Sequence, residues 1–434
     1  MMIDAQMPTR IVFGAGRLDE LASLDLPGSH ALVCTTGSAR PERKALLGRV
    51  IRLLDGAEVE ATVYEGITPN PTIGEVWEAC ALAKERGCDF VVGLGGGSSI
   101  DAAKAVAMMM RQDGDLWDYA YTGSGGKKEI VDAAPVVAIS TTAGTGTETD
   151  PYSVITKTET GEKLDFAADA LYPTVSIIDP ELMLSLPRDQ TIYQGIDALF
   201  HAAECAITNR GVNRLVDVFA LESISSVLTW LPVVVEDPSN IEGRTMLAYA
   251  ADICSGYTQS LINTTSHHII AQTIGGMFPS VAHGASLIMI AEEYYRRIAA
   301  FVPDELDRVG MYLGVDSCGY PAGQSFAVGL AGFFDRLGVR GLSMADCGIA
   351  WDDLPAIADA AVNRTGIADV DLYTLTEEDV LGLLQRSYRE GFDGRRRIQR
   401  DARGLVRRGN QLVAGCRSRG ARGGCRNLLR WPPR

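Results

Sequence analysis

The residue types best suited to chemistry in this 434-residue chain lie between Asp197 and His283. Asp197 and His201 are four residues apart, a spacing that places two side chains on one face of a helix. Four of the five histidines fall in this stretch, the later ones being His267, His268 and His283. Carboxylate oxygen and imidazole nitrogen suit a divalent metal such as Fe(II) or Zn(II), and two later histidines would complete four ligands. Taken singly, each side chain is better explained as a hydrogen-bonding group of the core or surface.

A glycine cluster upstream has the features of a phosphate-binding turn. Residues 95–98 read Gly-Gly-Gly-Ser, directly after an apolar strand predicted at 89–94 and before a helix predicted at 100–110. Glycines let the backbone approach a phosphate closely, and free N–H groups at a helix start face the anion. The cluster is neither a Walker A loop nor a full G-x-G-x-x-G, because Ser98 stands where the third glycine would be. The alternative is a tight turn without a ligand.

The elements that must position these residues fall into two groups. Strands are predicted at 8–14, 30–36, 58–64, 89–94, 135–140 and 175–179, with helices at 41–55, after 70–72 and at 100–110. This alternation predicts an α/β domain with a parallel sheet covered by helices on both faces, at 1–186. Helical periods follow at 191–209, 212–230, 241–261, 264–275 and 284–300, and more continue to about 388. We therefore expect an all-helical second domain at 187–389.

Composition excludes several classes of protein. The apolar content of 46% is too high for a disordered chain. The apolar runs are too short to cross a bilayer, and the N-terminus lacks a signal-peptide pattern. Nine cysteines without a CxxC pair indicate reduced thiols in a cytoplasm. The net charge is −15, but residues 390–434 hold thirteen arginines, three acids and no lysine. We expect this basic tail to be disordered, and the acidic remainder makes nucleic acid an improbable partner.

Six motifs, in this order, resemble those of the iron-containing (family III) alcohol dehydrogenase family. They are Thr-Pro-Asn-Pro-Thr at 68–72, the glycine cluster with Asp101 and Lys104, Ser-Thr-Thr-Ala-Gly-Thr-Gly-Thr-Glu at 140–148, Asp-Pro at 179–180, Asp-Ala-x-x-His at 197–201, and the block at 267–284. Together they cover roughly residues 8–389. The resemblance implies an N-terminal dinucleotide-binding domain, an all-helical metal-binding domain, and an active site in the cleft between them. It also implies NAD or NADP as hydride carrier and one Fe(II), sometimes replaced by Zn(II).

Residue roles carry over from the family by position. The metal ligands would be Asp197, His201, His268 and His283. The cofactor would be held by Gly96, Gly97 and Ser98 at the pyrophosphate, Thr141, Thr142 and Thr145 at the adenine and ribose end, and Lys163 at the nicotinamide ribose. Asp101 joins this cofactor set, although it could equally cap or brace its helix. Such a metal acts as a Lewis acid on an alcohol or carbonyl oxygen, while hydride passes to or from the nicotinamide.

The chain departs from the family pattern at one position near the metal. In many members a histidine follows the third ligand by four residues, whereas here the residue is Gln272. An amide forms hydrogen bonds but does not titrate near neutral pH. We predict Gln272 and His267 as catalytic residues, with His267 a candidate for the proton relay. Neighbouring helical residues diverge by about 100°, and only the alignment assigns the ligand role to His268 rather than His267.

The function predicted is metal-dependent hydride transfer between NAD(P) and an alcohol/aldehyde or ketone pair. No acid follows the second strand, where Arg40 and small hydroxyls would accept a 2′-phosphate, so NADP should be tolerated. Related alternatives are a maleylacetate reductase and a glycerol dehydrogenase-like enzyme; a dehydroquinate synthase-like lyase is disfavoured, because its lysine-rich pattern is not evident. The alternative from another class is a non-catalytic nucleotide-binding protein. We expect a cytoplasmic homo-oligomer, at least a dimer, that acts on a small molecule without a membrane.

Overall fold

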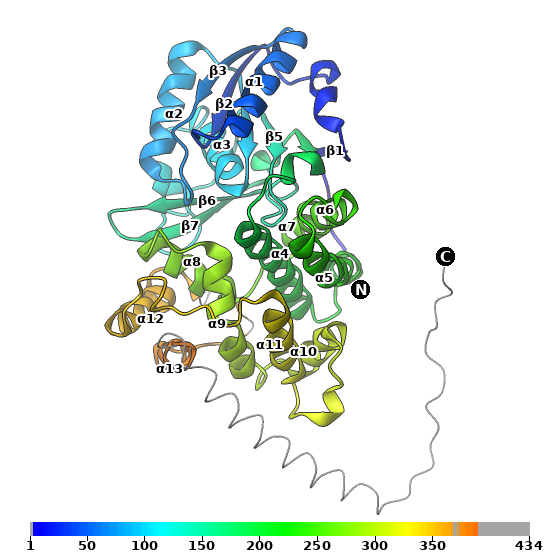
Figure 1. Cartoon of the computed structure of the whole chain (residues 1–434). Helices are drawn as coiled ribbons and strands as arrows, with labels where there is room; N and C mark the ends of the chain where they lie inside the picture. Colours follow the sequence, from blue (N-terminus) through cyan, green and yellow to red (C-terminus); the bar gives the residue numbers. More distant parts are fainter. Residues whose placement is uncertain (1–2, 368–370, 372, 389–434) are drawn as a thin grey trace, which may run out of the picture. The chain divides into compact units, whose positions relative to one another are not determined.

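The computed structural model describes residues 3–367, 371 and 373–388, so the predicted tail at 390–434 lies outside the described residues. Six parallel strands form one sheet (Figure 1). Their order in the sheet is β1-β8-β5-β4-β2-β3. Their bounds are β1 Arg10–Phe13, β2 His30–Thr35, β3 Glu60–Tyr64, β4 Phe90–Gly95, β5 Val136–Ser140 and β8 Val175–Ile178. The α/β architecture expected from the alternating pattern is therefore present.

Each face of the sheet carries its own apolar core, because side chains alternate along a strand and both faces of a parallel sheet are covered. Leu32 and Cys34 of β2 pack into the core shared with α2 and α3, and Ala31 and Val33 pack into the core shared with α1. The bounds of these helices are α1 Pro41–Gly56, α2 Ile73–Arg86 and α3 Gly97–Met109. Thr72 caps α2 and forms a reciprocal capping box with Glu75.

The carboxyl ends of the central strands lie at one edge of the sheet. Thr35 pairs with Leu94, Gly95 with Ser140, and Ser140 with Ile178 in the register. The chain places β3 on one side of β2 and then returns to place β4 on the other side. Ligands of open α/β sheets bind at the carboxyl edge near such a reversal, and the glycine cluster follows β4 at this point.

An antiparallel hairpin, β6 Tyr152–Lys157 and β7 Glu162–Ala167, lies outside the main sheet. It is not among the strands predicted from the sequence. Leu164 and Phe166 are buried in the core next to α3, whereas Lys163 and Asp165 alternate with them on the other face. The hairpin therefore directs two charged side chains away from the core.

All described elements after β8 are helical, and α4 begins at Arg188, close to the boundary predicted at residue 187. Their bounds are α4 Arg188–Asn209, α5 Arg214–Glu236, α6 Ile241–Ala248, α7 Gly256–Leu261, α8 Ser266–Met277, α9 His283–Ile298, α10 Pro303–Gly310, α11 Ser325–Leu337, α12 Leu354–Asn363 and α13 Glu377–Ser387. A large apolar core joins all of these helices except α7. Between α6 and α7, residues Tyr249–Ser255 form a π-helix, so the period predicted at 241–261 is one helix with a wider central segment.

Helix α5 differs from the expectation drawn from apolar runs. By length and mean hydropathy alone it could cross a membrane, and it is the single such helix among the described residues. Its buried residues, including Ala220, Ile224 and Val227, belong to the same apolar core as α4. A helix that packs in the core of a protein passes the same test, so this finding is weak evidence for a membrane span.

Candidate active site

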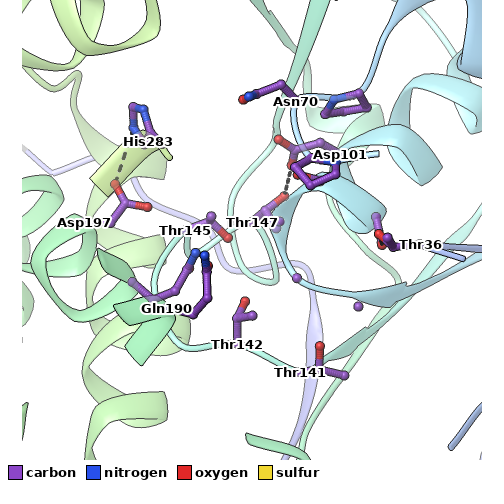
Figure 2. A pocket seen from close by; sticks show the side chains of 18 of the residues that line it. Thr36, Asn70, Asp101, Thr141, Thr142, Thr145, Thr147, Gln190, Asp197 and His283 are labelled. Atoms are coloured by element: carbon purple, nitrogen blue, oxygen red, sulfur yellow. Dashed lines mark hydrogen bonds and ion pairs between the residues drawn. The ribbon is translucent and has the colours of Figure 1, made fainter. Parts of the chain in front are cut away.

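One cavity, of about 1200 Å³, receives nearly all the side chains that the sequence singles out. It lies between the carboxyl edge of the sheet, the loop at 140–148, the β6–β7 hairpin and helices α4, α8 and α9 (Figure 2). The predicted residues that line it are Gly96, Gly97, Ser98, Asp101, Thr141, Thr142, Thr145, Lys163, Asp197, His201, His268, Gln272 and His283. His267 is absent from the lining. A volume of this size exceeds that of an ordinary small-ligand pocket and suits a dinucleotide together with a small substrate.

Asp197 stands at the centre of three imidazoles. Its Oδ1 atom lies 3.7 Å from Nε2 of His201, 3.4 Å from Nε2 of His268 and 3.5 Å from Nε2 of His283. Asp197 and His201 share one face of α4, His268 comes from α8, and His283 begins α9. The rings of His201 and His268 stack with centroids 4.2 Å apart. Helix α4 and the consecutive helices α8 and α9 thus bring a carboxylate and three imidazoles together.

The separations from Asp197 fit the ligand spacing of a metal site, and the ligand atoms of Asp197, His268 and His283 all lie within 4.8 Å of one another. Ligand atoms about 2.1 Å from a divalent ion at tetrahedral angles stand about 3.4 Å from one another. The distances of 3.4–3.7 Å are long for hydrogen bonds but match ligand spacing. Burial lowers the pKa of His201 to about 4, despite the opposing effect of Asp197, whereas at His268 burial is outweighed by Glu204 and Asp197, which raise its pKa to about 10. Metal binding would therefore require His268 to release a ring proton. The donor set therefore fits the Fe(II) or Zn(II) that the sequence suggested.

Glu204, which is not among the predicted site residues, forms a hydrogen bond with the ring nitrogen of His268 that faces away from Asp197. It lies on α4, seven residues after Asp197, and is fully buried. Its Oε1 atom lies 2.9 Å from Nδ1 of His268 and 2.8 Å from Nδ1 of His267. Metal-binding histidines commonly donate their other ring nitrogen to a carboxylate, which fixes ring orientation and tautomer. The i, i+7 spacing from Asp197 was the sequence signal that could have found Glu204.

His267 and His268 have different surroundings, as neighbouring residues on a helix should. Nε2 of His267 lies 3.1 Å from the carbonyl oxygen of Leu287, and Nδ1 faces Glu204, so both ring nitrogens have partners. The ring is fully buried against Tyr294 and Tyr295. This geometry favours His268 as the ligand and disfavours the proton-relay role suggested for His267.

The glycine cluster forms a cradle at the start of α3. The helix begins at Gly97, earlier than predicted, and its N-cap Gly96 forms no side-chain cap. A Cβ atom at Gly97 would come within 2.5 Å of Thr145, and one at Gly96 within 2.9 Å of Thr142. Glycine is thus required where the two loops touch. The uncapped N–H groups at the start of this 13-residue helix fit a pyrophosphate.

Asp101 and Lys163 hold the hairpin to the rest of the site. Asp101 accepts hydrogen bonds from Thr147 at 2.8 Å and from the backbone N–H of Val154 at 3.2 Å, so it braces α3 against β6 (Figure 2). This is the second of the two roles that the sequence allowed. Lys163 donates to Asn70 Oδ1 at 2.8 Å, and burial lowers its pKa. A cofactor-binding role for either residue stays a prediction.

Gln272 lies one helical turn beyond His268 on α8 and lines the same cavity. Its Nε2 atom donates to Asp165 Oδ1 at 3.3 Å. The amide therefore contacts a carboxyl group that comes from the unanticipated hairpin.

Comparisons with known proteins agree with this site. Residues 8–180 match the family model for iron-containing alcohol dehydrogenase, and residues 191–388 match the C-terminal model of the same family. A long-chain primary alcohol dehydrogenase of Thermoanaerobacter ethanolicus is 30% identical over 387 residues, covering 88% of this chain and 95% of the relative.

Two solved structures resemble the chain over 89% of its length and 99% of theirs. One is a mutant of an archaeal halo-thermophilic alcohol dehydrogenase from a Red Sea brine pool, with 28% identity and a TM-score of 0.82. The other is an NADH-dependent butanol dehydrogenase of Thermotoga maritima, with 28% identity and a TM-score of 0.80. The chain belongs to the iron-containing alcohol dehydrogenase family of oxidoreductases.

Proposed function

We propose that this protein is a metal-dependent dehydrogenase that transfers hydride between NAD(P) and an alcohol/aldehyde pair. The observation that carries the proposal is that one cavity contains both the glycine cradle at Gly96 and Gly97 and the four-donor cluster around Asp197. A dinucleotide whose pyrophosphate rests on the cradle has room to extend toward the cluster within this cavity. Names of relatives, among them a primary alcohol dehydrogenase and a butanol dehydrogenase, favour primary alcohols as the substrate class.

Different residues of the cavity would bind the metal and the cofactor. Asp197, His201, His268 and His283 would hold the metal, which when bound supplies a Lewis acid for the substrate oxygen. Glu204 keeps the His268 ring turned so that Nε2 faces Asp197. The cradle and the loop at 140–148 would hold the cofactor, and Lys163 and Asn70, joined by a 2.8 Å hydrogen bond, line the same cavity. Fixed positions for donor and acceptor lower the barrier by removing the cost of bringing them together.

The alternatives make different predictions. A non-catalytic nucleotide-binding protein has no need for a buried carboxylate with three imidazole nitrogens 3.4–3.7 Å from it, whereas this chain has that arrangement. A maleylacetate reductase or a glycerol dehydrogenase-like enzyme would share the fold and differ in substrate.

Metal analysis combined with NADH and NADPH oxidation over a panel of aldehydes separates these possibilities. We expect about one divalent ion per chain and turnover of simple aldehydes. Bound nucleotide without metal or turnover would support the binding protein. Turnover confined to maleylacetate, or to dihydroxyacetone as the ketone of glycerol, would support the related branches.

Cofactor choice is the second testable part of the proposal. Arg40 and Ser38 line the far end of the cavity after β2, where no acid follows the strand. We propose that Arg40 faces the 2′-phosphate of NADPH, so Arg40→Ala should raise KM for NADPH about tenfold and leave KM for NADH nearly unchanged. Arg49→Ala is the control, because Arg49 pairs with Asp19 outside the cavity. A strong preference of the wild type for NADH, with no effect of Arg40→Ala, would contradict the assignment.

We also propose a homo-oligomer of two or more subunits, on the strength of the family resemblance, and a cytoplasmic location, because the scattered cysteines are typical of reduced thiols. Size-exclusion chromatography with light scattering measures the assembly state directly. Molecular masses near that of one chain, 46.6 kDa, at micromolar concentration would contradict it.

A further inference from the structure

Asp165 is a carboxyl group in the cavity that the proposed function does not yet use. It lies on β7, where Leu164 and Phe166 enter the core and Asp165 faces the opposite way, into the cavity. In the hairpin it pairs with Val154, next to the brace formed by Asp101. The backbone on both sides of it is therefore held by strand pairing, which gives the carboxyl group a fixed position.

Asp165 faces the side of α8 that carries His268, one of the proposed metal ligands. Gln272 and His268 are four residues apart on α8, and Gln272 donates to Asp165 Oδ1 at 3.3 Å. Among the described residues, Asp165 Oδ2 has no hydrogen-bond partner. The Oε1 atom of Gln272 is buried and likewise lacks a partner in the described part of the chain. One oxygen of the carboxylate is thus held by Gln272, and the other is available to a molecule in the cavity.

Oxidation of an alcohol releases a proton in addition to the hydride, so the site needs a group that accepts it. Asp197 and the three histidines around it would hold the metal. Three other titratable groups face Asp165 from α3, β6 and β7: Asp101, Tyr152 and Lys163. Both oxygens of Asp101 accept hydrogen bonds, and Lys163 donates to Asn70. Burial raises the pKa of Tyr152 well above its ordinary value, so its hydroxyl does not act as a base.

Resting on the dehydrogenase function proposed above, we propose that Asp165 is the proton acceptor in alcohol oxidation and the proton donor in aldehyde reduction. In oxidation the O–H bond breaks and its proton passes to Asp165 Oδ2. The C–H bond breaks with its electron pair, which leaves as hydride to the nicotinamide, and the C=O bond forms. Reduction reverses each step, so atoms and charge balance in both directions. Gln272 is then a positioning residue that holds Oδ1 and leaves Oδ2 directed at the substrate.

The electrostatic surroundings suit this role. Burial raises the pKa of Asp165 to about 6, an effect that Asp101 reinforces and that Lys163, Gln272 and His268 oppose. A general acid–base group works best when its pKa lies near the operating pH, because both of its forms are then populated. Asp165 should be the carboxylate above this pH, as oxidation requires, and the acid below it, as reduction requires.

The experiment compares Asp165→Asn with wild-type protein as pH profiles of kcat in both directions, with the metal bound. For the wild type we expect kcat for oxidation to rise and kcat for reduction to fall as pH increases through about 6. In Asp165→Asn, kcat should no longer change with pH near 6 in either direction and should fall about 100-fold, with KM changed less than threefold. Asp169→Asn, on an exposed acid that bonds Gln6, should keep the wild-type profile. Metal content and NADH binding, measured on each variant, show that the protein is folded.

The outcomes separate this inference from the proposed function. If the wild type neither binds metal nor turns over any aldehyde, the dehydrogenase proposal itself fails. If the wild type turns over and Asp165→Asn keeps both pH dependences and more than a third of kcat, Asp165 is not the proton-transfer group. A raised KM with an unchanged kcat profile would likewise overturn the inference, because it would make Asp165 a substrate-binding residue alone.

Discussion

His268→Ala should leave the protein without its metal ion and lower kcat/KM by at least about 1000-fold. The change removes one of four donors, and a Lewis acid contributes several kcal/mol to the transition state of such a reaction. His267→Ala is the matched comparison, since both rings are buried on the same helix and both face Glu204. It should cost about 2–4 kcal/mol of unfolding free energy through lost packing and hydrogen bonds, while the metal remains bound.

Metal content by elemental analysis and unfolding by denaturant titration distinguish the two variants. If His267→Ala lost the metal and His268→Ala kept it, the ligand assignment would be reversed. Equal loss of metal in both variants would indicate that metal binding depends on an intact N-terminus of α8 rather than on one particular ring.

Glu204→Gln should weaken metal binding about 10- to 100-fold without removing any donor atom. Burial alone would raise the pKa of Glu204, but the neighbouring His268 and His267 rings outweigh it and hold the pKa well below the usual range. The ionised carboxylate therefore accepts N–H bonds from both rings, and a neutral amide holds the His268 ring less firmly.

Tyr295→Phe is the control for Glu204→Gln, because it removes a 3.2 Å hydrogen bond to the same Oε1 atom and leaves both histidine contacts. Its metal affinity should stay within about threefold of the wild type. Competition with a chelator of known affinity gives the dissociation constants. Unchanged metal affinity in Glu204→Gln, or an equal loss in Tyr295→Phe, would show that Glu204 does not support the site through His268.

The sequence allowed the main architecture to be predicted because the signals are local. Each strand run, the glycine cluster and the Asp197–His201 pair involves only residues that are close together in the chain. The order of strands in the sheet depends on crossovers and could not be predicted in this way. The choice between His267 and His268 needed the partners of each ring, Leu287 and Glu204, which approach only after folding.

The hairpin residues also make contacts that local sequence patterns do not predict. Asp165 contacts Gln272, a residue 107 positions later in the chain, and no pattern near either residue indicates the contact. Glu204 is different, because its spacing from Asp197 placed it on the ligand face of α4 from the start.

The π-helix at Tyr249–Ser255 fixes the length of a helix that supplies none of the four proposed metal ligands. Each π-turn adds one residue, which rotates everything after it by about 100° relative to an uninterrupted α-helix. Because of that rotation Gly256 faces Gly146, where a Cβ atom would come within 2.3 Å of the Gly146 carbonyl oxygen. The neighbours Ser255 and Tyr257 carry side chains that this space does not admit. An insertion or deletion of one residue in this helix would therefore be transmitted to the loop that closes on the glycine cradle.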